Sequence, residues 1–235
     1  MRRYNESMNV RRHGVVAVLA IVPCVLIAQH VPKELPRVAS GQLARSLSAA
    51  APHAHHLWRD SPPTNPDGTV NGYIEIPLGE RRKYEFDISL NRRGIDRVMP
   101  DELGGYPVNY GFVPQTVSYD GDPFDVLVLG PALRGGEIVR GVIVGVMYME
   151  DEKGLDSKVV LSPVAPDGRA KYDLTPQIRD EIADYFRRYK QGEPGKFSKV
   201  PGWGTVVEGR DLVTTTHAFF RECRKHAGTV CRVQQ

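Results

Sequence analysis

The sequence predicts an α+β domain that is mainly β, and three observations support this fold class. Short runs rich in β-branched residues recur between residues 73 and 163, separated by Gly, Pro, Asn and Asp, which is typical of a compact sheet or barrel. Two later segments place apolar residues at three- and four-residue spacing, which is typical of amphipathic helices. The sequence shows no internal repeat, which excludes solenoids and propellers.

The chain begins with a charged and then an apolar segment. Four arginines within the first 12 residues precede an uncharged apolar run over residues 14–28. This order is typical of a secretory signal, and the run is shorter than the roughly 20 apolar residues that span a bilayer. We therefore expect residues 1–28 to be a signal peptide or a membrane anchor, and the protein to be exported or to face out of the cytoplasm. Membrane contact is expected only through residues 14–28.

The next segment, residues 29–72, is rich in Pro, Ser, Ala and His. Neither a helical nor a strand period persists in it, apart from a short stretch near residues 43–51. The composition therefore predicts a linker. His53, His55 and His56 could ligate a metal, but in a solvated, Pro-rich segment this is the weaker interpretation.

The folded domain is predicted over residues 73–226, followed by a C-terminal tail at residues 227–235. Strands are expected over residues 73–76, 84–88, 112–117, 125–128, 138–149 and 158–163. Helices are expected over residues 177–190 and 211–225, where apolar side chains recur at helical spacing. Both helices are expected to pack against the sheet.

Charge and cysteine content exclude two classes of function. The formal net charge is only +3 and the basic residues are scattered, so no nucleic-acid partner is indicated. The three cysteines show no C-x-x-C spacing, which argues against a zinc ribbon or a redox motif. Cys223 and Cys231 could pair in an oxidising compartment, but their spacing does not decide whether they do.

The most specific stretch places three acids within six residues: Asp120, Asp122 and Asp125. A glycine and a proline between them restrict the backbone, and the apolar residues 126–129 predict a buried strand directly afterwards. Carboxylates held at the mouth of a buried strand repel one another unless cations bind. Clusters of oxygen ligands suit hard cations, and Mg²⁺ is preferred where phosphate oxygens complete its octahedron.

Other interpretations of these residues stay open at this point. An exposed acidic turn is common, and an EF-hand would need a glycine at its sixth position and a closing Glu, which this stretch lacks. A second acidic turn, at residues 151–158, could be an ordinary charged hairpin. Taken alone, Tyr106 and Tyr110 would be packing aromatics, and Lys83 and Glu85 would be an ion pair on one face of a strand.

Taken together, these motifs resemble the soluble family I inorganic pyrophosphatases, over about residues 73–225. The family signature D-G-D-P-x-D is met in full from Asp120 to Asp125. The other positions that match the site of the family are Glu75, Lys83, Glu85, Arg97, Tyr106, Tyr110, Asp151, Asp156, Lys158, Tyr189 and Lys190. The resemblance implies a compact five-stranded OB-like β-barrel flanked by two main α-helices.

The resemblance also implies hydrolysis of pyrophosphate to two phosphates by a metal-activated hydroxide. Asp122 is the implied general base, and Tyr110 is the second catalytic residue, beside the nucleophile. The implied metal ligands are Asp120, Asp125, Asp151, Asp156, Glu75 and Glu85, with Lys158 holding these acids apart. The residues assigned to phosphate oxygens are Lys83, Arg97, Tyr106, Tyr189 and Lys190.

The cofactor implied by the resemblance is Mg²⁺, at about three to four ions per site with substrate. Mn²⁺ or Zn²⁺ is expected to substitute, and Ca²⁺ to inhibit. A homo-oligomer is also implied. The segment between residues 163 and 175 looks shorter than in typical bacterial members, which leaves the number of subunits open.

Two other functions fit parts of the pattern. A non-enzymatic module could hold Ca²⁺ or phosphate, but it would need neither a base at Asp122 nor cations at Lys83, Arg97 and Lys190. A broader phosphohydrolase could act on nucleotides or polyphosphate, although the sequence shows no platform for stacking a base. Comparing rates on ADP, ATP and tripolyphosphate with the rate on pyrophosphate separates these functions.

Overall fold

The computed structural model describes residues 37–225. The expected signal or anchor at residues 1–28 and the expected tail at residues 227–235 lie outside the described residues. Within the described range, no helix has the length and apolar character needed to cross a membrane.

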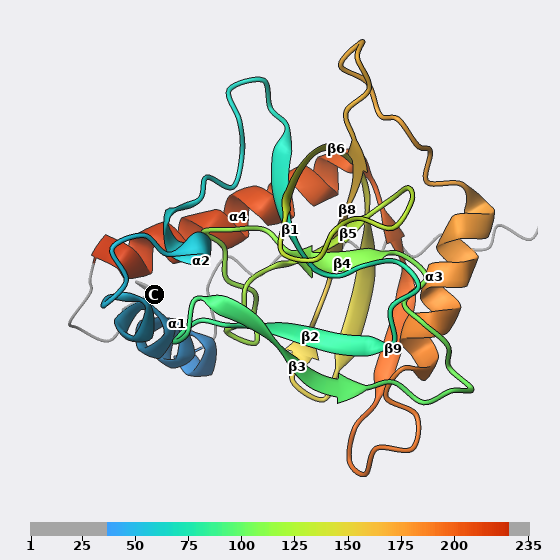
Figure 1. The fold of residues 1–235 in the computed structure, drawn as a ribbon, viewed down its shortest axis with the longest axis horizontal. Helices are drawn as coiled ribbons and strands as arrows, with labels where there is room; N and C mark the ends of the chain where they lie inside the picture. Colours follow the sequence, from blue (N-terminus) through green and yellow to red (C-terminus); the bar gives the residue numbers. More distant parts are fainter. Residues whose placement is uncertain (1–36, 226–235) are drawn as a thin grey trace, which may run out of the picture. The chain divides into compact units, whose positions relative to one another are not determined.

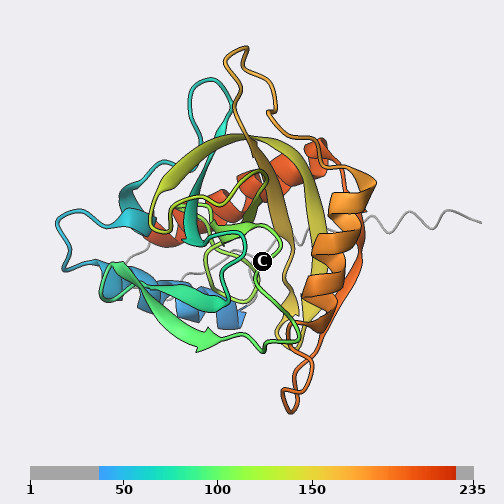
Figure 2. The same cartoon turned by 45° about the vertical axis from the view of Figure 1, so that its right-hand side comes forward.

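Five strands form a closed ring at the centre of the fold (Figure 1). They are β1 (Val70–Ile76), β4 (Asn109–Phe112), β5 (Asp125–Val128), β8 (Lys158–Pro163) and β6 (Ile138–Asp151). Each pairs with the next in this order, and β6 returns to pair with β1. The pairs are antiparallel except β5 with β8, which is parallel. Figure 2 shows β6 as the long curved strand that makes this closure possible. The prediction of a mainly β fold of the α+β class is confirmed.

Four further strands lie outside the ring. β7 (Gly154–Leu155) and β9 (Ser198–Gly204) both pair with β6. β2 (Arg82–Asp87) and β3 (Arg92–Val98) form a separate antiparallel hairpin, which lies in front of the ring in Figure 1. The sequence did not predict β3 or β9, because both mix glycine and charged residues with few apolar ones.

The strand expected over residues 112–117 is wrong beyond its first residue, since β4 ends at Phe112. Pro114 has no N–H to donate to a sheet ladder, and Gln115 takes a left-handed backbone conformation with φ of 51°. The chain therefore leaves the sheet before residue 117.

The two predicted helices are present, as α3 (Pro176–Arg188) and α4 (Val206–Lys225). The hydroxyl of Thr175 caps α3 by accepting from the N–H of Ile178. α4 begins five residues earlier than expected, because Thr205 and Glu208 form a capping box in which each side chain accepts from the N–H of the other. The first turn of α4 exposes Val206 and Val207, so apolar spacing could not reveal it.

The prediction of a linker over residues 29–72 is wrong for its described part. Residues 37–72 contain α1 (Arg37–Ala50), α2 (Leu57–Asp60) and the start of β1. The residues that α1 buries include Ala39, Leu43 and Ala50. Because Leu43 is the only large apolar residue of these three, and serines lie among them, this helix gave little helical signal. Trp58 in α2 is fully buried, and its ring meets that of Phe220 in α4 edge to face at 5.2 Å.

A buried core fills the space between the ring, α3 and β9. It includes Ile76, Leu127, Met147, Val160, Ile182 and Phe186. The other long helix, α4 (red in Figure 1), runs behind the ring and packs on β6. Cys223 in α4 is disulfide-bonded. The sequence left a pairing of Cys223 with Cys231 undecided, and both Cys24 and Cys231 lie outside the described residues.

Candidate functional site

Strand register brings the acidic segments to one edge of the ring. Val126 of β5 lies opposite Val159 of β8, so Asp125 and Lys158 begin parallel neighbouring strands side by side. β6 runs antiparallel to β8 and ends beyond this edge, at Asp151. The turn between β4 and β5 carries the remaining acids of the D-G-D-P-F-D motif to the same edge.

Lys158 lies among these acids, and only 1% of its side chain is exposed. Its Nζ donates to Oδ2 of Asp125 at 2.5 Å and to Oδ1 of Asp156 at 2.9 Å. The rings of Tyr110 and Phe186 flank the ammonium group, each with its centroid 5.7 Å away. One buried cation therefore contacts two of the predicted metal ligands at once.

A second lysine pairs with the end of β6. Lys190, which follows α3, donates from Nζ to Oδ2 of Asp151 at 2.6 Å and to both carboxylate oxygens of Glu152 at 3.0 Å. Tyr189 precedes it, and burial together with the nearby Asp156 raises the pKa of this tyrosine. The structure thus places the Y-K pair, which follows α3, beside the acids at the end of β6.

The β2–β3 hairpin contributes the other predicted cations. Lys83 and Arg97 lie opposite each other in the register of the hairpin. Nζ of Lys83 is 2.5 Å from Oε1 of Glu85, so the ion pair considered from sequence is present. Arg97 pairs with Glu193 at 3.0 Å, a partner that the sequence did not indicate. Both carboxylates hold these cations in place.

Glu75 and two tyrosines line the interior of the site. Oε1 of Glu75 accepts from the N–H of Phe86 at 2.6 Å, and the rings of Tyr106 and Tyr110 lie 5.6 Å apart. Burial and the nearby Asp125 raise the pKa of Tyr110, and burial is also the main cause of the raised pKa of Tyr106. Both phenols therefore stay neutral, as groups that can donate a hydrogen bond.

Crowding and burial strongly perturb the carboxyl groups of this edge. Burial and the neighbouring Asp122 raise the pKa of Asp120 to about 7. Burial raises the pKa of Asp156 to about 8, against the lowering effect of Lys158. Burial and Asp125 raise the pKa of Glu75 well above its usual value. Each of these carboxyl groups would ionise more readily beside additional positive charge.

The donor set fits a hard divalent cation, because it consists of several carboxylates gathered at one buried edge. As the side chains stand, no three acidic, histidine or cysteine groups of residues 37–225 form a ready-made metal site. Lysines stand between the acids instead: Lys158 as described, and Lys153, whose Nζ is 3.2 Å from Oδ2 of Asp122 and 3.6 Å from Oδ2 of Asp120. Metal binding would require these lysines to shift relative to the carboxylates.

The raised pKa values predict how stability depends on pH without metal. The carboxyl groups of Asp120 and Asp156 keep their protons to about pH 7 and about pH 8 in the folded state, whereas an unfolded aspartate loses its proton near pH 3.8. Their contribution to stability is therefore complete below about pH 4 and is lost progressively up to about pH 8. In chelator, the free energy of unfolding measured with urea should fall between about pH 5 and pH 8.

Saturating Mg²⁺ should reverse this trend, since bound metal replaces the protons and binds more tightly as the carboxyl groups ionise. Asp156→Asn should flatten the slope in chelator. An identical slope in Mg²⁺ and in chelator would contradict the assignment of these carboxyl groups to a metal site.

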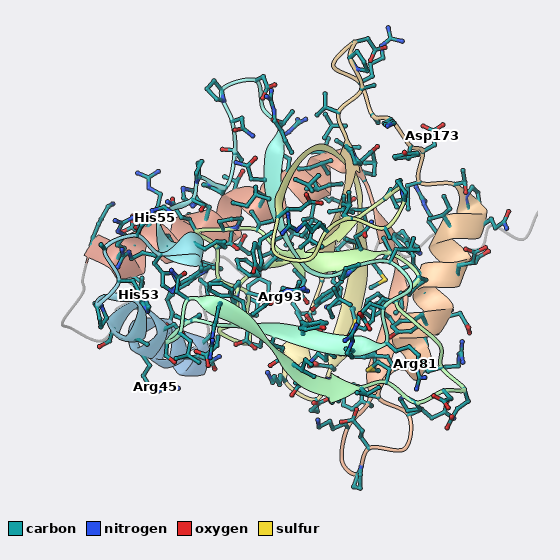
Figure 3. The ribbon with its side chains drawn as sticks, in the orientation of Figure 1. Arg45, His53, His55, Arg81, Arg93 and Asp173 are labelled. Carbon is teal, nitrogen blue, oxygen red and sulfur yellow. The ribbon has the colours of Figure 1, made fainter. Side chains whose placement is uncertain are left out.

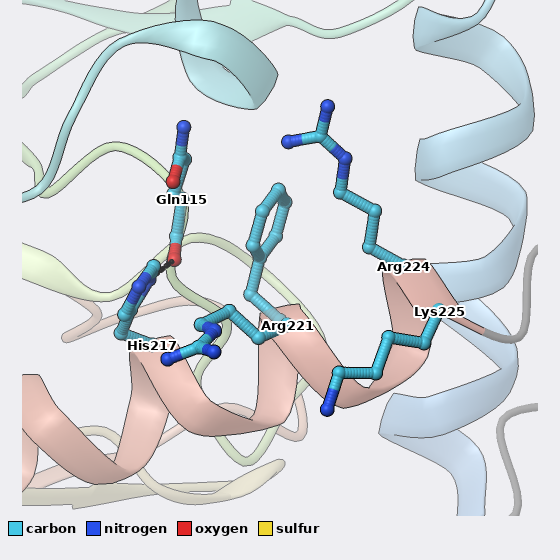
Figure 4. A pocket seen from close by; sticks show the side chains of 6 residues that line it. Gln115, His217, Arg221, Arg224 and Lys225 are labelled. Carbon is cyan, nitrogen blue, oxygen red and sulfur yellow. Dashed lines mark hydrogen bonds between the residues drawn. The ribbon is translucent and has the colours of Figure 1, made fainter.

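A pocket of about 450 Å³ lies elsewhere, near the C-terminal end of α4 (Figure 4). It is lined by Gln115, His217, Phe220, Arg221, Arg224 and Lys225. Nδ1 of His217 lies 2.7 Å from the carbonyl oxygen of Gln115. The lining includes none of the predicted site residues, so we place the functional site at the carboxylate edge of the ring.

The structure adds three residues to the predicted site: Gln42, Lys153 and Glu193. Lys153 lies within the second acidic turn, but its position in the sequence did not indicate a role for it. Glu193 lies in a loop far along the chain from Arg97, and Gln42 lies in the segment taken as a linker. The amide Nε2 of Gln42 donates to Oδ1 of Asp122 at 2.5 Å.

Comparisons with known proteins bear on the identity of this site. Residues 72–221 match the family model described as inorganic pyrophosphatase. An inorganic pyrophosphatase of Saccharolobus solfataricus is 40% identical over 151 residues, which cover 61% of this chain and 87% of that protein. One from Rhodospirillum rubrum is 41% identical over 157 residues, covering 63% of this chain and 87% of that protein.

Among solved structures, this chain is again similar to inorganic pyrophosphatases. The chain is similar to an inorganic pyrophosphatase from Coxiella burnetii with a TM-score of 0.63 and 38% identity, covering 68% of this chain and 99% of that one. For the inorganic pyrophosphatase from Thermus thermophilus, the TM-score is 0.64 and the identity is 36%. The match covers 71% of this chain and 99% of that one. On its sequence, its fold and the acids gathered at the edge of its ring, this chain belongs to the inorganic pyrophosphatase family.

Proposed function

We propose that this protein is an inorganic pyrophosphatase, which hydrolyses diphosphate to two phosphates. The proposal depends on one observation in a chain of this family: acidic side chains and basic side chains from separate elements lie close together. Acids from the motif at Asp120, from the end of β6 and from the turn before β8 share one edge of the ring with Lys158 and Lys190. The hairpin cations lie near enough to act electrostatically on the same site, Lys83 on Glu75 and Arg97 on Tyr189. A cation site alone would not need those anion-binding side chains.

The acids divide into metal ligands and a base. Asp120, Asp125, Asp151, Asp156, Glu75 and Glu85 are the residues that would hold Mg²⁺. Bound Mg²⁺ would neutralise substrate charge and lower the pKa of a water molecule. Asp122 is 47% exposed, more than Asp120 or Asp125, so its carboxylate is open to accept a proton from water. Tyr110 is buried beside Asp125 and would orient groups near that water.

The cations bind the substrate. The guanidinium of Arg97 suits bidentate contact with a phosphate, while Lys83 and Lys190 act as point charges. All three are now paired with carboxylates, which the phosphate oxygens would replace. Tyr106 and Tyr189 complete the set as neutral donors.

Finer properties follow from the family resemblance. We infer that the ring is an OB-like barrel, which its closure through β6 and β1 supports. About three to four Mg²⁺ ions per site, replacement by Mn²⁺ or Zn²⁺, and inhibition by Ca²⁺ are part of the same proposal. So is a homo-oligomer, for which the exposed Ile95 and Val98 of the hairpin offer apolar contact area.

Substrate choice tests the proposed function. With Mg²⁺, phosphate release from pyrophosphate should exceed release from ADP, ATP and tripolyphosphate by about 10²-fold or more, because every role that we assign to the site is directed at the metal ions or at the oxygens of a diphosphate. Initial rates at equal substrate and Mg²⁺ concentrations measure this ratio. Comparable rates on all four substrates would replace the proposal with a general phosphohydrolase.

We also propose that the protein is exported. The charged and apolar order of residues 1–28 supports this, and so does the disulfide of Cys223, since disulfides persist in oxidising compartments. Residues 1–36 fused to a reporter enzyme should carry it out of the cytoplasm. A reporter that stays entirely in the cytoplasm would contradict the proposal.

A further inference from the structure

A side chain from outside the family-matched region contacts the candidate base. Gln42 lies in α1, whereas the family model begins at residue 72. Its Nε2 donates to Oδ1 of Asp122 at 2.5 Å, while Nζ of Lys153 is 3.2 Å from Oδ2. The two oxygens of the Asp122 carboxylate thus have different partners, one neutral and one charged.

The neighbouring glycine makes this contact possible. Gly121 has a φ of 94°, and a Cβ atom at this position would come within 2.8 Å of Cβ of Gln42. Because the glycine of the D-G-D motif has no side chain, the aliphatic part of Gln42 can pack directly against it. Packing against Gly121 and the hydrogen bond to Asp122 converge on the same glutamine.

Several hydrogen bonds fix the segment that carries Gln42. The rings of His53 and His56 bind the carbonyl oxygens of Ser89 and Ile88, each at 2.8 Å, at the turn of the β2–β3 hairpin. The N–H of Leu57 donates to Oδ1 of Asn91 at 2.9 Å in the same turn. Figure 3 shows His53 at this end of the hairpin and Arg81 at the other. The histidines therefore anchor the segment to the hairpin that carries Lys83 and Arg97.

The same segment is bound to the loop that leads to the acidic motif. Nε1 of Trp58 donates to the carbonyl oxygen of Thr116 at 3.0 Å, and the N–H of Gln115 donates to the carbonyl oxygen of Trp58 at 2.8 Å. Arg59 closes the connection to α1 by donating to the carbonyl oxygens of Ala50 and His53, both at 2.8 Å. The C-terminal end of α1 is thus connected, through residues 53–59, both to the hairpin turn and to the loop before the acidic motif.

We propose that residues 37–69 form part of the active site, and that Gln42 is a positioning residue for Asp122. This inference rests on the proposed function of Asp122 as the base. A half-exposed aspartate after a glycine can adopt several rotamers, and a fixed amide donor on Oδ1 selects one of them. The donor is neutral, so it orients the carboxylate without cancelling its charge, and the proton is left to Oδ2, which Nζ of Lys153 contacts at 3.2 Å.

Gln42→Met separates the hydrogen bond from the packing, because methionine keeps the length and the apolar contact with Gly121 but has no amide donor. We expect kcat for pyrophosphate to fall about three- to tenfold with KM unchanged, as for the loss of one hydrogen bond that positions a catalytic group. Ser48→Ala, on an exposed position of the same helix, should leave both constants unchanged. In an Asp122→Asn background, Gln42→Met should have no further effect.

Hydrogen exchange gives a second readout that does not depend on activity. In the full-length protein, Gln42→Met should raise exchange of the backbone amides of residues 118–122 by about threefold or more, with β8 unchanged. A kcat within twofold of the wild-type value, or an equal loss in the Asp122→Asn background, would overturn the proposal. If the wild-type protein fails to hydrolyse pyrophosphate, the proposed function fails, and unchanged exchange in residues 118–122 would then separately overturn the positioning role.

Discussion

Asp122→Asn is expected to lower kcat for pyrophosphate by roughly 10²-fold or more near neutral pH, because an amide cannot accept the proton of the attacking water. Asparagine has the same shape and keeps an oxygen that can accept from Gln42. The side chain is 47% exposed, so the substitution buries no new unpaired group and the fold should persist. Mg²⁺ binding should be largely retained, since the implied ligands are other acids.

The measurement is the initial rate of phosphate release, together with the shift in melting temperature on adding Mg²⁺. Asp180→Asn, an exposed acid on α3, is the matched control and should match the wild-type rate. If Asp122→Asn kept the wild-type kcat, Asp122 would not be the base. If it lost the Mg²⁺-dependent shift as well, Asp122 would belong among the metal ligands.

Lys158→Met should lower the free energy of unfolding in chelator by about 3 kcal/mol. Methionine fills a similar volume but leaves the carboxyl groups of Asp125 and Asp156 without the cation that both now contact. Removing one partner of a buried ionic cluster is costly because the remaining charges stay buried. Saturating Mg²⁺ should recover much of the loss, since metal can take over the neutralisation of the acids.

Urea unfolding at pH 8, with chelator and with Mg²⁺, measures both effects. Lys153→Met is the matched control, because its ion pairs are half-exposed and its loss should cost under about 1 kcal/mol. Equal destabilisation by the two substitutions would show that Lys158 is not an essential counter-charge for the acids.

The sequence was sufficient to predict where the D-G-D-P-F-D motif lies in the fold. The D-G-D-P-F-D motif before an apolar run predicted Asp125 at the start of a buried strand, where the structure places it. The second acidic turn was ambiguous alone, and only the parallel pairing of β5 with β8 brings Asp156 and Lys158 beside Asp125. That pairing joins strands about 30 residues apart in the chain, so it could not be inferred from local spacing.

The N-terminal segment could not be predicted for a different reason. α1 buries alanines and one leucine, so its composition is similar to that of a solvated Ser/Ala-rich linker. The N-terminal segment makes its contacts with distant elements: His53 and His56 with the β2–β3 turn, and Gln42 of α1 with Asp122. Partners of this kind depend on tertiary packing, which overrides local composition. The pairing of Arg97 with Glu193 was missed for the same reason.

Phosphate release from pyrophosphate by the purified full-length protein tests the proposed function most directly. Initial rates should be measured with Mg²⁺, with Ca²⁺ and with chelator, alongside a melting curve that shows the protein to be folded. Rapid turnover with Mg²⁺, little with Ca²⁺ and none with chelator is the predicted result. A folded protein that binds Mg²⁺ but releases no phosphate would contradict it, and the acids gathered at the edge of the ring would then be a binding site without catalysis.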